Sequence, residues 1–393
     1  MDVSRESDFD VCIVGAGPAG LALATALARC GLRCQVLEQQ SGDSLERPAE
    51  DGREIALTHR ARRIMERLGM WERLLPEDIS PLREARVSTG QSSFVLPFEA
   101  AAHGHEALGW LVPNHRIRAV AHAAACNEPN VTIRGDTRVV GLERPGRGTV
   151  LHTADGSRHA VPLVVAADSR FSTVRRMAGI GARMLDFGRV AIVAAMEHEA
   201  EHGGVAHECF RYGNTLATLP MTGRRSSVVV TLKGDESVTW LALDPENFAT
   251  RIEAQLSGRL GGMRLVGQRH HYPLVAVYAH RFCGPNFALA GDAAVGMHPV
   301  TAHGYNFGLY GVEVLARELE RGIGDAALRR YESEHRRTTL PIYEGTNAIV
   351  RLFTDDALPA RLARHAVLRI ARALPPLRDV ISRQITGGSV RRA

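Results

Sequence analysis

The segment "GAGPAG" has the residue types and the spacing of a turn that binds the pyrophosphate of a dinucleotide. It follows an apolar, β-prone run and precedes the helix-favouring "LALATALARCG". Gly15 would allow the tight turn, Gly17 would let the pyrophosphate approach the backbone, and Gly20 would let the helix pack on the strand. Pro18 and Ala19 would open that helix, whose unpaired N–H groups attract phosphate.

A second predicted strand, "RCQVLEQ", carries Glu38 at its end. In a βαβ unit of this kind, an acid at that distance from the turn holds a ribose hydroxyl. Strand, turn, helix, second strand and acid therefore stand in the order that a dinucleotide site requires. The pattern does not separate FAD from NAD.

Two further apolar strands end at acids. "VPLVVAAD" ends at Asp168, and "NFALAGDA" ends at Gly291 and Asp292. Ligands of open α/β sheets bind beside the carboxyl ends of the strands, so these ends should converge with the glycine turn on one extended ligand. After Asp292, "AVGMHPVTAHGYNFGLYG" is rich in glycine, and a helix is predicted from about Tyr305, with a dipole that would favour an anion.

Composition excludes several function classes. The 393 residues are 45% hydrophobic and 23% charged, with a net charge of +5. Lys233 is the only lysine, and the arginines are spread without an aromatic-flanked patch, so no nucleic-acid partner is expected. The six cysteines form no CxxC pair, which favours reduced thiols in a cytoplasmic protein and no metal site. No apolar run reaches the roughly 20 residues of a membrane span.

The remaining sequence predicts an α/β fold. Arg53 is expected just before a helix that contains Ile64 and Leu68, and residues 112–126 are expected to form a helix. Short strands between 131 and 165 predict an inserted β-meander, and residues 187–278 predict a separate sheet interrupted by one helix.

Taken in order, these motifs resemble those of class A flavoprotein monooxygenases of the para-hydroxybenzoate hydroxylase fold. Within that group the chain is most similar to the ubiquinone-biosynthesis hydroxylases. The resemblance covers essentially the whole length, through "GAGPAG", "GREIAL…RLGMW", "ADSRFSTVRR", "GNTLATLPM", "YPL", "ALAGDAAVGMHP" and "ISRQITGG".

The resemblance implies a Rossmann-like FAD-binding domain with the inserted meander, a mixed-sheet substrate domain and C-terminal helices. The expected FAD-binding domain comprises 1–79, 104–182 and 278–340; the substrate domain comprises 80–103 and 183–277; the C-terminal helical region is 341–393.

The resemblance also implies roles for single residues. Gly15, Gly17, Pro18, Ala19, Gly20 and Glu38 would bind the ADP moiety of FAD. The residues expected near the phosphates, the ribityl chain or the flavin ring are Arg53, Arg118, Asp168, Gly291, Asp292, Gly304, Tyr305 and Asn306. Asp168 would also serve the nicotinamide donor.

The expected catalytic residues are Pro299, His303 and Tyr305, placed against the flavin ring by the same resemblance; His298 is a weaker candidate for polarising the flavin or a phenol. The chain departs from the family pattern at Ser169, which replaces a glycine, and at Val295, which replaces a histidine. Two more departures are "TAHGYN" for "AGQGLN", and Gly311 in place of an acid. These departures bear on substrate choice more than on FAD binding.

The implied chemistry is hydroxylation of an aromatic ring. NADH or NADPH, bound transiently, would reduce FAD, and O2 would then form a flavin C4a-hydroperoxide that hydroxylates a polyprenylated phenol or quinol in ubiquinone biosynthesis. Two alternatives stay open: a hydroxylase of a small soluble aromatic or natural product, and a non-oxygenating FAD-binding reductase or accessory protein.

The tail 357–393 holds eight arginines and one acid, and apolar residues recur in it at helical steps interrupted by Pro375 and Pro376. It is expected to form helices that pack on the protein or that rest on anionic lipid. The expected location is cytoplasmic, with peripheral membrane contact or membership of a quinone-biosynthesis complex left open, as is the choice between monomer and homodimer.

Overall fold

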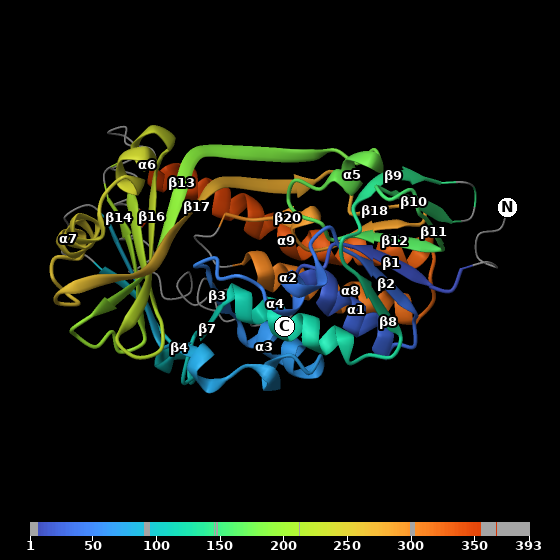
Figure 1. Ribbon diagram of the computed structural model, residues 1–393. Coiled ribbons are helices and arrows are strands. Elements are labelled where there is room, and N and C mark those ends of the chain that lie inside the picture. Colours follow the sequence, from blue (N-terminus) through green and yellow to red (C-terminus); the bar gives the residue numbers. More distant parts are fainter. Residues whose placement is uncertain are drawn as a thin grey trace.

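The computed structural model describes residues 7–89, 95–144, 146, 148–211, 213–298, 303–354 and 367. Two large sheets organise this part of the chain, and Figure 1 shows them at opposite ends of the molecule.

The first is a six-stranded sheet in the order β18-β19-β12-β1-β2-β8. Its strands are β1 (Val11–Val14), β2 (Cys34–Leu37), β8 (Val131–Arg134), β12 (Leu163–Ala166), β18 (Cys283–Gly284) and β19 (Phe287–Leu289). All neighbours pair in parallel except β18 with β19. The central strands β1 and β12 are wholly buried, which matches their unbroken apolar sequences.

Helices cover this sheet and are interleaved with its strands along the chain. α1 (Pro18–Arg29) connects β1 to β2 and packs against α4 (Asn114–Cys126) and α8 (Gly304–Glu320). The long α9 (Asp325–Thr354) lies along α8. The short helices are α2 (Gly42–Glu46) and α5 (Thr173–Met177). Alternating strands and helices of this kind confirm the predicted Rossmann-like architecture.

The predicted meander is smaller than expected. Only β9 (Val139–Glu143), β10 (Thr149–Thr153) and β11 (Arg158–Val161) form the three-stranded inserted sheet. The strands that flank them in sequence, β8 and β12, instead belong to the parallel sheet, where they pair with β2 and β1. The prediction missed this because β2 and β1 are far away in the sequence.

The second large sheet has eight strands in the order β20-β17-β13-β16-β15-β14-β5-β6. Their bounds are β5 (Glu84–Thr89), β6 (Val95–Glu99), β13 (Ala182–His198), β14 (Val205–Phe210), β15 (Thr215–Pro220), β16 (Arg225–Lys233), β17 (Met263–Ala279) and β20 (Val295–Gly296). β13 and β17 are 17 residues each and run along one side of the molecule from one large sheet to the other (Figure 1).

Two helices, α6 (Gly234–Leu241) and α7 (Pro245–Leu256), cover the outer face of this sheet (Figure 1). Ile192, Val230 and Cys209 from the sheet pack there with Trp240 and Phe248 from the helices. The sequence predicted a single helix in this region. It missed α6, which is short and follows β16 without a turn-rich segment to separate them.

A third sheet, β3-β7-β4, is built from β3 (Glu54–Leu57), β4 (Ser80–Leu82) and β7 (Gly109–Pro113). The expectation that Arg53 directly precedes a helix was therefore wrong, because β3 lies between Arg53 and α3 (His59–Arg67). The helix expected over 112–126 begins at Asn114, because β7 continues to Pro113.

The division into domains remains a prediction, and α9 crosses its last boundary, between residues 340 and 341. The helices expected between 357 and 393 lie outside the described residues, apart from residue 367. Within the described ranges, no helix combines the length and the apolar character that a membrane span requires.

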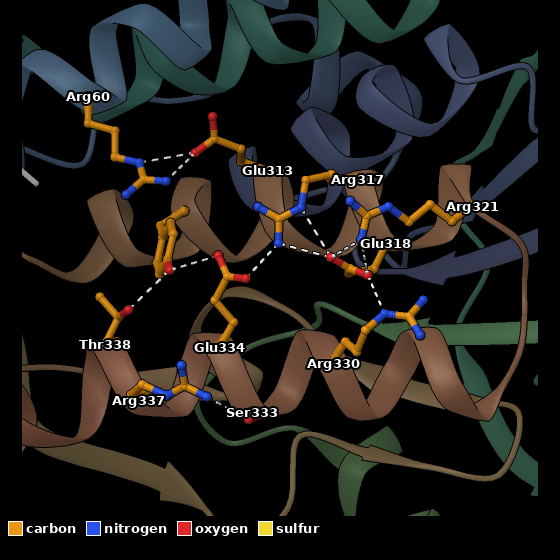
Figure 2. Close-up of polar contacts among 11 residues, drawn as sticks. Arg60, Glu313, Arg317, Glu318, Arg321, Arg330, Ser333, Glu334, Arg337 and Thr338 are labelled. Atoms are coloured by element: carbon orange, nitrogen blue, oxygen red, sulfur yellow. Dashed lines mark hydrogen bonds and ion pairs between the residues drawn. The ribbon is translucent and has the colours of Figure 1, made fainter. Parts of the chain in front are cut away.

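A network of ion pairs joins α3, α8 and α9 (Figure 2). The carboxylate of Glu318, only 3% exposed, accepts from Arg330 at 2.6 Å, from Arg317 at 3.0 Å and from Arg321 at 3.1 Å. Arg317 also donates to Glu334 at 2.6 Å. These contacts fix α8 between its neighbours.

Two further residues connect this network to α3. Arg60 donates to Glu313 at 2.7 Å, and its guanidinium lies 4.1 Å from the centre of the Tyr310 ring. The Tyr310 hydroxyl donates to Glu334 at 3.3 Å and lies 3.0 Å from the hydroxyl of Thr338 (Figure 2). The position of α8 therefore depends on charges as well as on apolar packing.

Glu318→Gln should destabilise the protein, because three guanidinium groups would then lie together without their shared carboxylate. Since the arginines are about half exposed, we expect a loss of about 1–2 kcal/mol, seen as a lower melting temperature. Glu320→Gln, at an exposed position of the same helix, is the matched control. Equal melting temperatures for the two variants would show that the network contributes little.

Candidate active site

The strand ends that were predicted to converge lie side by side at one edge of the parallel sheet. The N–H of Gly15 donates to the carbonyl of Leu37 at 2.8 Å, and the N–H of Ala167 donates to that of Val14 at 2.8 Å. The N–H of Ala290 donates to the carbonyl of Ala166 at 2.9 Å. Glu38, Gly15, Asp168 and Gly291 thus follow neighbouring strands β2, β1, β12 and β19.

The glycine turn is tight where it meets the protein and open where a ligand would lie. Gly15 has φ +109°, and a Cβ on it would lie 2.5 Å from the carbonyl oxygen of Ala167. A Cβ on Gly20 would lie 2.1 Å from the carbonyl oxygen of Gly15. A Cβ on Gly17 would meet nothing within 4 Å. Gly17 is also the N-cap of α1 and carries no capping side chain, so the first N–H groups of the helix stay available.

Glu38, at the end of β2, forms a hydrogen bond with the backbone of this turn. Its carboxylate accepts from the N–H of Ala16 at 2.7 Å and from that of Gln40 at 2.9 Å. Arg118 reaches the same place from α4 and donates to the side chain of Gln40 at 2.9 Å. Both predicted residues therefore lie beside the end of β2, and their contact with a cofactor remains a prediction.

Asp168 is engaged with the start of α5. It accepts from the hydroxyl of Ser172 at 2.5 Å and from the N–H groups of Thr173 and Val174 at 2.8 and 3.3 Å. The departure residue Ser169 accepts from the N–H of Phe171 at 3.2 Å. Asp168 thus fixes the turn after β12, while its proposed service to FAD and to the nicotinamide donor is untested.

Asp292 lies in the 3-10 helix η5 (Gly291–Ala293) and is held by arginines that sequence reasoning missed. Arg170 donates to Asp292 at 2.9 Å and to the carbonyl of Val275 on β17 at 3.1 Å. Arg175, buried, donates to the carbonyl of Ala293 at 2.9 Å. Both arginines stand in the motif "ADSRFSTVRR", but nothing local indicates that they reach η5.

The start of α8 is packed against η5 and α1 through residues with little or no side chain. A Cβ on Gly291 would lie 2.9 Å from that of Ala19, and one on Gly308 would lie 3.5 Å from it. Like α1, α8 begins without a capping side chain and without an acid in its first turn. Two helix N-termini without capping side chains therefore belong to this cluster, and their dipoles suit an anionic or electron-rich ligand.

Asn306 has a structural task within α8. Its side-chain oxygen accepts from the N–H of Thr58 at 2.9 Å, and its amide donates to the carbonyl of Ala56 at 2.8 Å. It thereby ties the first turn of α8 to the connection between β3 and α3. Gly304 is the first residue of α8, and a Cβ on it would meet nothing within 4 Å, so this backbone is open.

Tyr305 has a buried hydroxyl that makes no hydrogen bond within the described ranges. Burial raises its pKa, so the hydroxyl stays neutral and able to donate. His303 is buried and lies 5.2 Å from the ring of Phe307. Pro299 lies outside the described residues. The catalytic roles given to these three residues remain predictions.

His298 is a poor base. Its ring packs edge-on against Phe187, with centroids 4.9 Å apart, and burial, followed by the charges of Arg170 and Arg189, lowers its pKa to about 4. It is neutral near pH 7, and the low basicity of its ring argues against its taking a proton from a phenol.

Arg53 directly precedes β3 and lies against β17 of the eight-stranded sheet. It donates to Asp51 through Nε at 3.1 Å, and Asp51 also accepts from Asn114 at 2.7 Å. The hydroxyl of Tyr272, on β17, donates to the carbonyl of Asp51 at 2.6 Å, and the Arg53 guanidinium lies 5.3 Å from the centre of that ring. The predicted arginine is thus placed against the eight-stranded sheet by Asp51, a residue that the sequence did not single out.

A family model described as an FAD binding domain matches residues 8–342. The chain belongs to this family. It is 42% identical over 389 residues to ubiquinone hydroxylase UbiM of Neisseria meningitidis, covering 96% of this chain and 84% of the relative. It is 36% identical to ubiquinone hydroxylase UbiL of Rhodospirillum rubrum, covering 98% and 91%.

Among solved structures, p-nitrophenol 4-monooxygenase PnpA of Pseudomonas putida matches with a TM-score of 0.79 at 20% identity, covering 98% of this chain and 99% of that one. At this identity the likeness concerns the fold alone. The expected family, fold class and activity class, an FAD-dependent hydroxylase, are confirmed.

The residues present fit FAD. The open space beside Gly17 and the uncapped start of α1 suit its pyrophosphate, and Glu38 stands where an adenosine ribose would lie. The unpaired hydroxyl of Tyr305 and the open backbone at Gly304 suit a planar, polar ring at the start of α8. The family's cofactor and this cluster therefore agree.

Gly17→Ala should leave the apoprotein folded but weaken FAD binding by about tenfold or more, because the new methyl group would occupy space that only the ligand fills. The backbone at Gly17, with φ −68°, accepts alanine without strain. Melting of the apoprotein and titration with FAD measure the two effects. Gly42→Ala, also at an open position, is the control. Wild-type FAD affinity in Gly17→Ala would contradict the site.

Asp292→Ala should lose FAD during gel filtration, as a direct contact to the ribityl chain requires. Arg170→Gln removes the ion pair but keeps the carboxylate, so it should retain most of the flavin. Absorbance of the eluted protein measures occupancy. Equal loss in both variants would show that Asp292 acts only by holding Arg170.

Proposed function

We propose that this protein is an FAD-dependent hydroxylase that adds oxygen to the aromatic ring of a polyprenylated phenol or quinol during ubiquinone biosynthesis. The observation that carries the proposal is the 42% identity, over nearly the whole chain, to a relative named ubiquinone hydroxylase. The second such relative, at 36% identity, supports it independently.

The residues that follow β1, β2, β12 and β19 would each bind a different part of FAD. The glycine turn and the start of α1 would bind the pyrophosphate, and Glu38 and Arg118 would lie at the adenosine side. Asp292 would hold the ribityl hydroxyls, and the first turn of α8 would support the flavin ring. When bound, FAD takes two electrons from NADH or NADPH and lets one oxygen atom of O2 reach the ring.

The chain's own contribution is orientation and exclusion of water. Arg170 and Arg175 keep η5 in place, Asn306 fixes the first turn of α8, and the network around Glu318 holds the rest of that helix. The hydroxyl of Tyr305 would donate a hydrogen bond to the ring system or to the substrate. A rigid frame of this kind keeps the reacting atoms in register.

We also propose a cytoplasmic location with peripheral contact to the membrane. A polyprenyl chain keeps such a substrate in lipid, and the arginine-rich tail 357–393 would favour an anionic surface. This part of the proposal, and the choice between monomer and homodimer, rests on sequence.

Deletion of the gene in its host should deplete ubiquinone and accumulate an intermediate that lacks one ring oxygen. The wild-type gene should restore the quinone pool, while the FAD-deficient Gly17→Ala variant should not. Extraction and mass analysis of the quinones give the answer. A normal quinone pool in the deletion strain would refute the proposed function.

A further inference from the structure

The inner face of the eight-stranded sheet contains a continuous row of side chains that leads to the cofactor side. The strand register places Glu208 of β14 beside Ala217 of β15, Ala217 beside Val229 of β16, and Val229 beside Val193 of β13. Val193 in turn neighbours His270 of β17. Directly paired residues lie on the same face, so these side chains form one line.

This face is opposite to the one that α6 and α7 cover. Residues one step along the strands, such as Cys209, Leu216 and Val230, pack against those helices. Alternation therefore sends Glu208 and its row to the inner face.

The row ends at the segment that carries Arg53. A Cβ on Gly52 would lie 2.7 Å from the ring of His270 and 3.6 Å from Val193. The next row on the same face ends at Tyr272, which donates to the carbonyl of Asp51. The inner face thus leads to residues 51–53, the segment that precedes β3 and carries Arg53.

Between Glu208 and Val193 the row is lined by small side chains. Ala217 and Val229 are partly exposed, and the three strand spacings span about 14 Å. This surface is apolar, shallow and long enough for an aromatic ring to lie on it.

Between β14 and β13, Glu208 is the only polar side chain of this row. Among the described residues its carboxyl makes no hydrogen bond and no ion pair. The side chain is only partly accessible to solvent. A carboxyl in apolar surroundings without a protein partner is a candidate for contact with a ligand or for a catalytic role.

The surroundings of Glu208 contain no compensating charge. Its neighbours on this face are Ala206, Phe210, Val87 and Ala217. Burial raises the pKa of the carboxyl to about 7.

The other elements nearby are equally apolar. β6 contributes Leu96 and Phe98, and α9 contributes Phe353, whose ring centre lies 4.5 Å from that of Phe210. Charged residues of the same sheet face, including Arg189, Glu197, Arg225 and Lys233, lie further along β13 and β16. The adjacent His207 points to the opposite face.

We propose that Glu208 is a catalytic residue that contacts a ring hydroxyl of the substrate and accepts its proton while the ring is hydroxylated. The bond from the hydroxyl oxygen to hydrogen breaks, a bond from that hydrogen to a Glu208 oxygen forms, and the proton returns when the product leaves. A ring with a deprotonated hydroxyl is richer in electrons and reacts faster with an electrophilic oxygen donor. This inference rests on the proposed function.

The test compares Glu208→Gln with wild type on a phenol that carries a short isoprenoid chain. General-base assistance accounts for about 100-fold or more, so product formation should fall by that factor while FAD content and NAD(P)H oxidation without the phenol stay unchanged. Wild-type turnover should rise with an inflection near pH 7, and the inflection should disappear in the variant. Glu99→Gln, an exposed carboxyl on the same sheet, should behave like wild type.

Stability provides a check that separates catalysis from folding. The folded protein holds the Glu208 proton more tightly than the unfolded chain, so ionisation of this group costs stability as the pH rises from about 5 to above 7. Glu208→Gln should therefore melt at the wild-type temperature or higher at pH 8. Should it fail to fold, Glu208→Asp replaces it, and its withdrawn carboxyl should lower turnover by about tenfold with the pH inflection retained.

The outcomes are distinct. Wild-type turnover and an unchanged pH profile in Glu208→Gln, or undiminished turnover in Glu208→Asp if the glutamine variant fails to fold, would overturn the role of Glu208 and leave the proposed function intact. A wild-type protein that binds FAD but never hydroxylates the prenylated phenol, in a host whose quinone pool does not need the gene, would overturn the proposed function itself.

Discussion

The whole arrangement depends on how closely the backbone can approach itself at the carboxyl end of the parallel sheet. Gly15, Gly20 and Gly291 lie where a Cβ would come within 3 Å of a neighbouring atom. Because these side chains are missing, α1, η5 and the start of α8 can meet beside the ends of β1, β12 and β19. Two uncapped helix N-termini then belong to one cluster, and the acids Glu38 and Asp292 lie beside it.

A small number of specific contacts hold the eight-stranded sheet in place relative to this cluster. β13 and β17 continue from one large sheet to the other, and Arg170 connects Asp292 to the backbone of β17. Asp51 gathers Arg53, Asn114 and Tyr272 at the second junction. The cofactor side and the inner face of the sheet are therefore linked by hydrogen bonds to charged groups, which are stronger and more directional than apolar contacts.

The sequence predicted the cofactor side well because its signals are local. A glycine turn, the strand before it and an acid at the end of the next strand all fall within one βαβ unit. At the other two strand ends, Asp168 and Asp292 directly follow the apolar residues of the strand. The places of β8, β12 and β19 in the sheet and the partners of Arg170 could not be predicted, because these contacts join residues that are far apart in the sequence. Asp51 was missed for the same reason, because its partners Asn114 and Tyr272 come from α4 and β17, far along the chain.

The substrate side is harder to predict, since a sheet face is defined by register. Val87, Glu208, Ala217, Val229 and Val193 come from five strands, and no spacing along the chain relates them. A single glutamate in "HECFRYG" has no motif around it. Only the pairing of β14 with β15 and β5 shows that this glutamate shares a face with small apolar side chains.

The two sides of the site treat polar groups in opposite ways. On the cofactor side Glu38, Asp168, Asp292 and Asn306 have their hydrogen-bond partners within the protein. Elsewhere, the buried hydroxyl of Tyr305 and the partly exposed carboxyl of Glu208 make no hydrogen bond with the described residues. A fully buried polar group without a partner costs about 1–3 kcal/mol, which is a noticeable share of the 5–15 kcal/mol by which proteins are usually stable.

A bound molecule that supplies the missing partner removes such a cost. Bound flavin and a hydroxylated ring would supply the missing partners. Binding of these two molecules should therefore stabilise the folded protein. A ligand with a ring hydroxyl in the correct position should bind more tightly than a purely apolar ligand. The apolar ligand would bury the Tyr305 hydroxyl and the Glu208 carboxyl without hydrogen-bond partners. Selectivity for a phenol or quinol then follows from the unsatisfied groups themselves, and the small side chains of the inner face need only provide room.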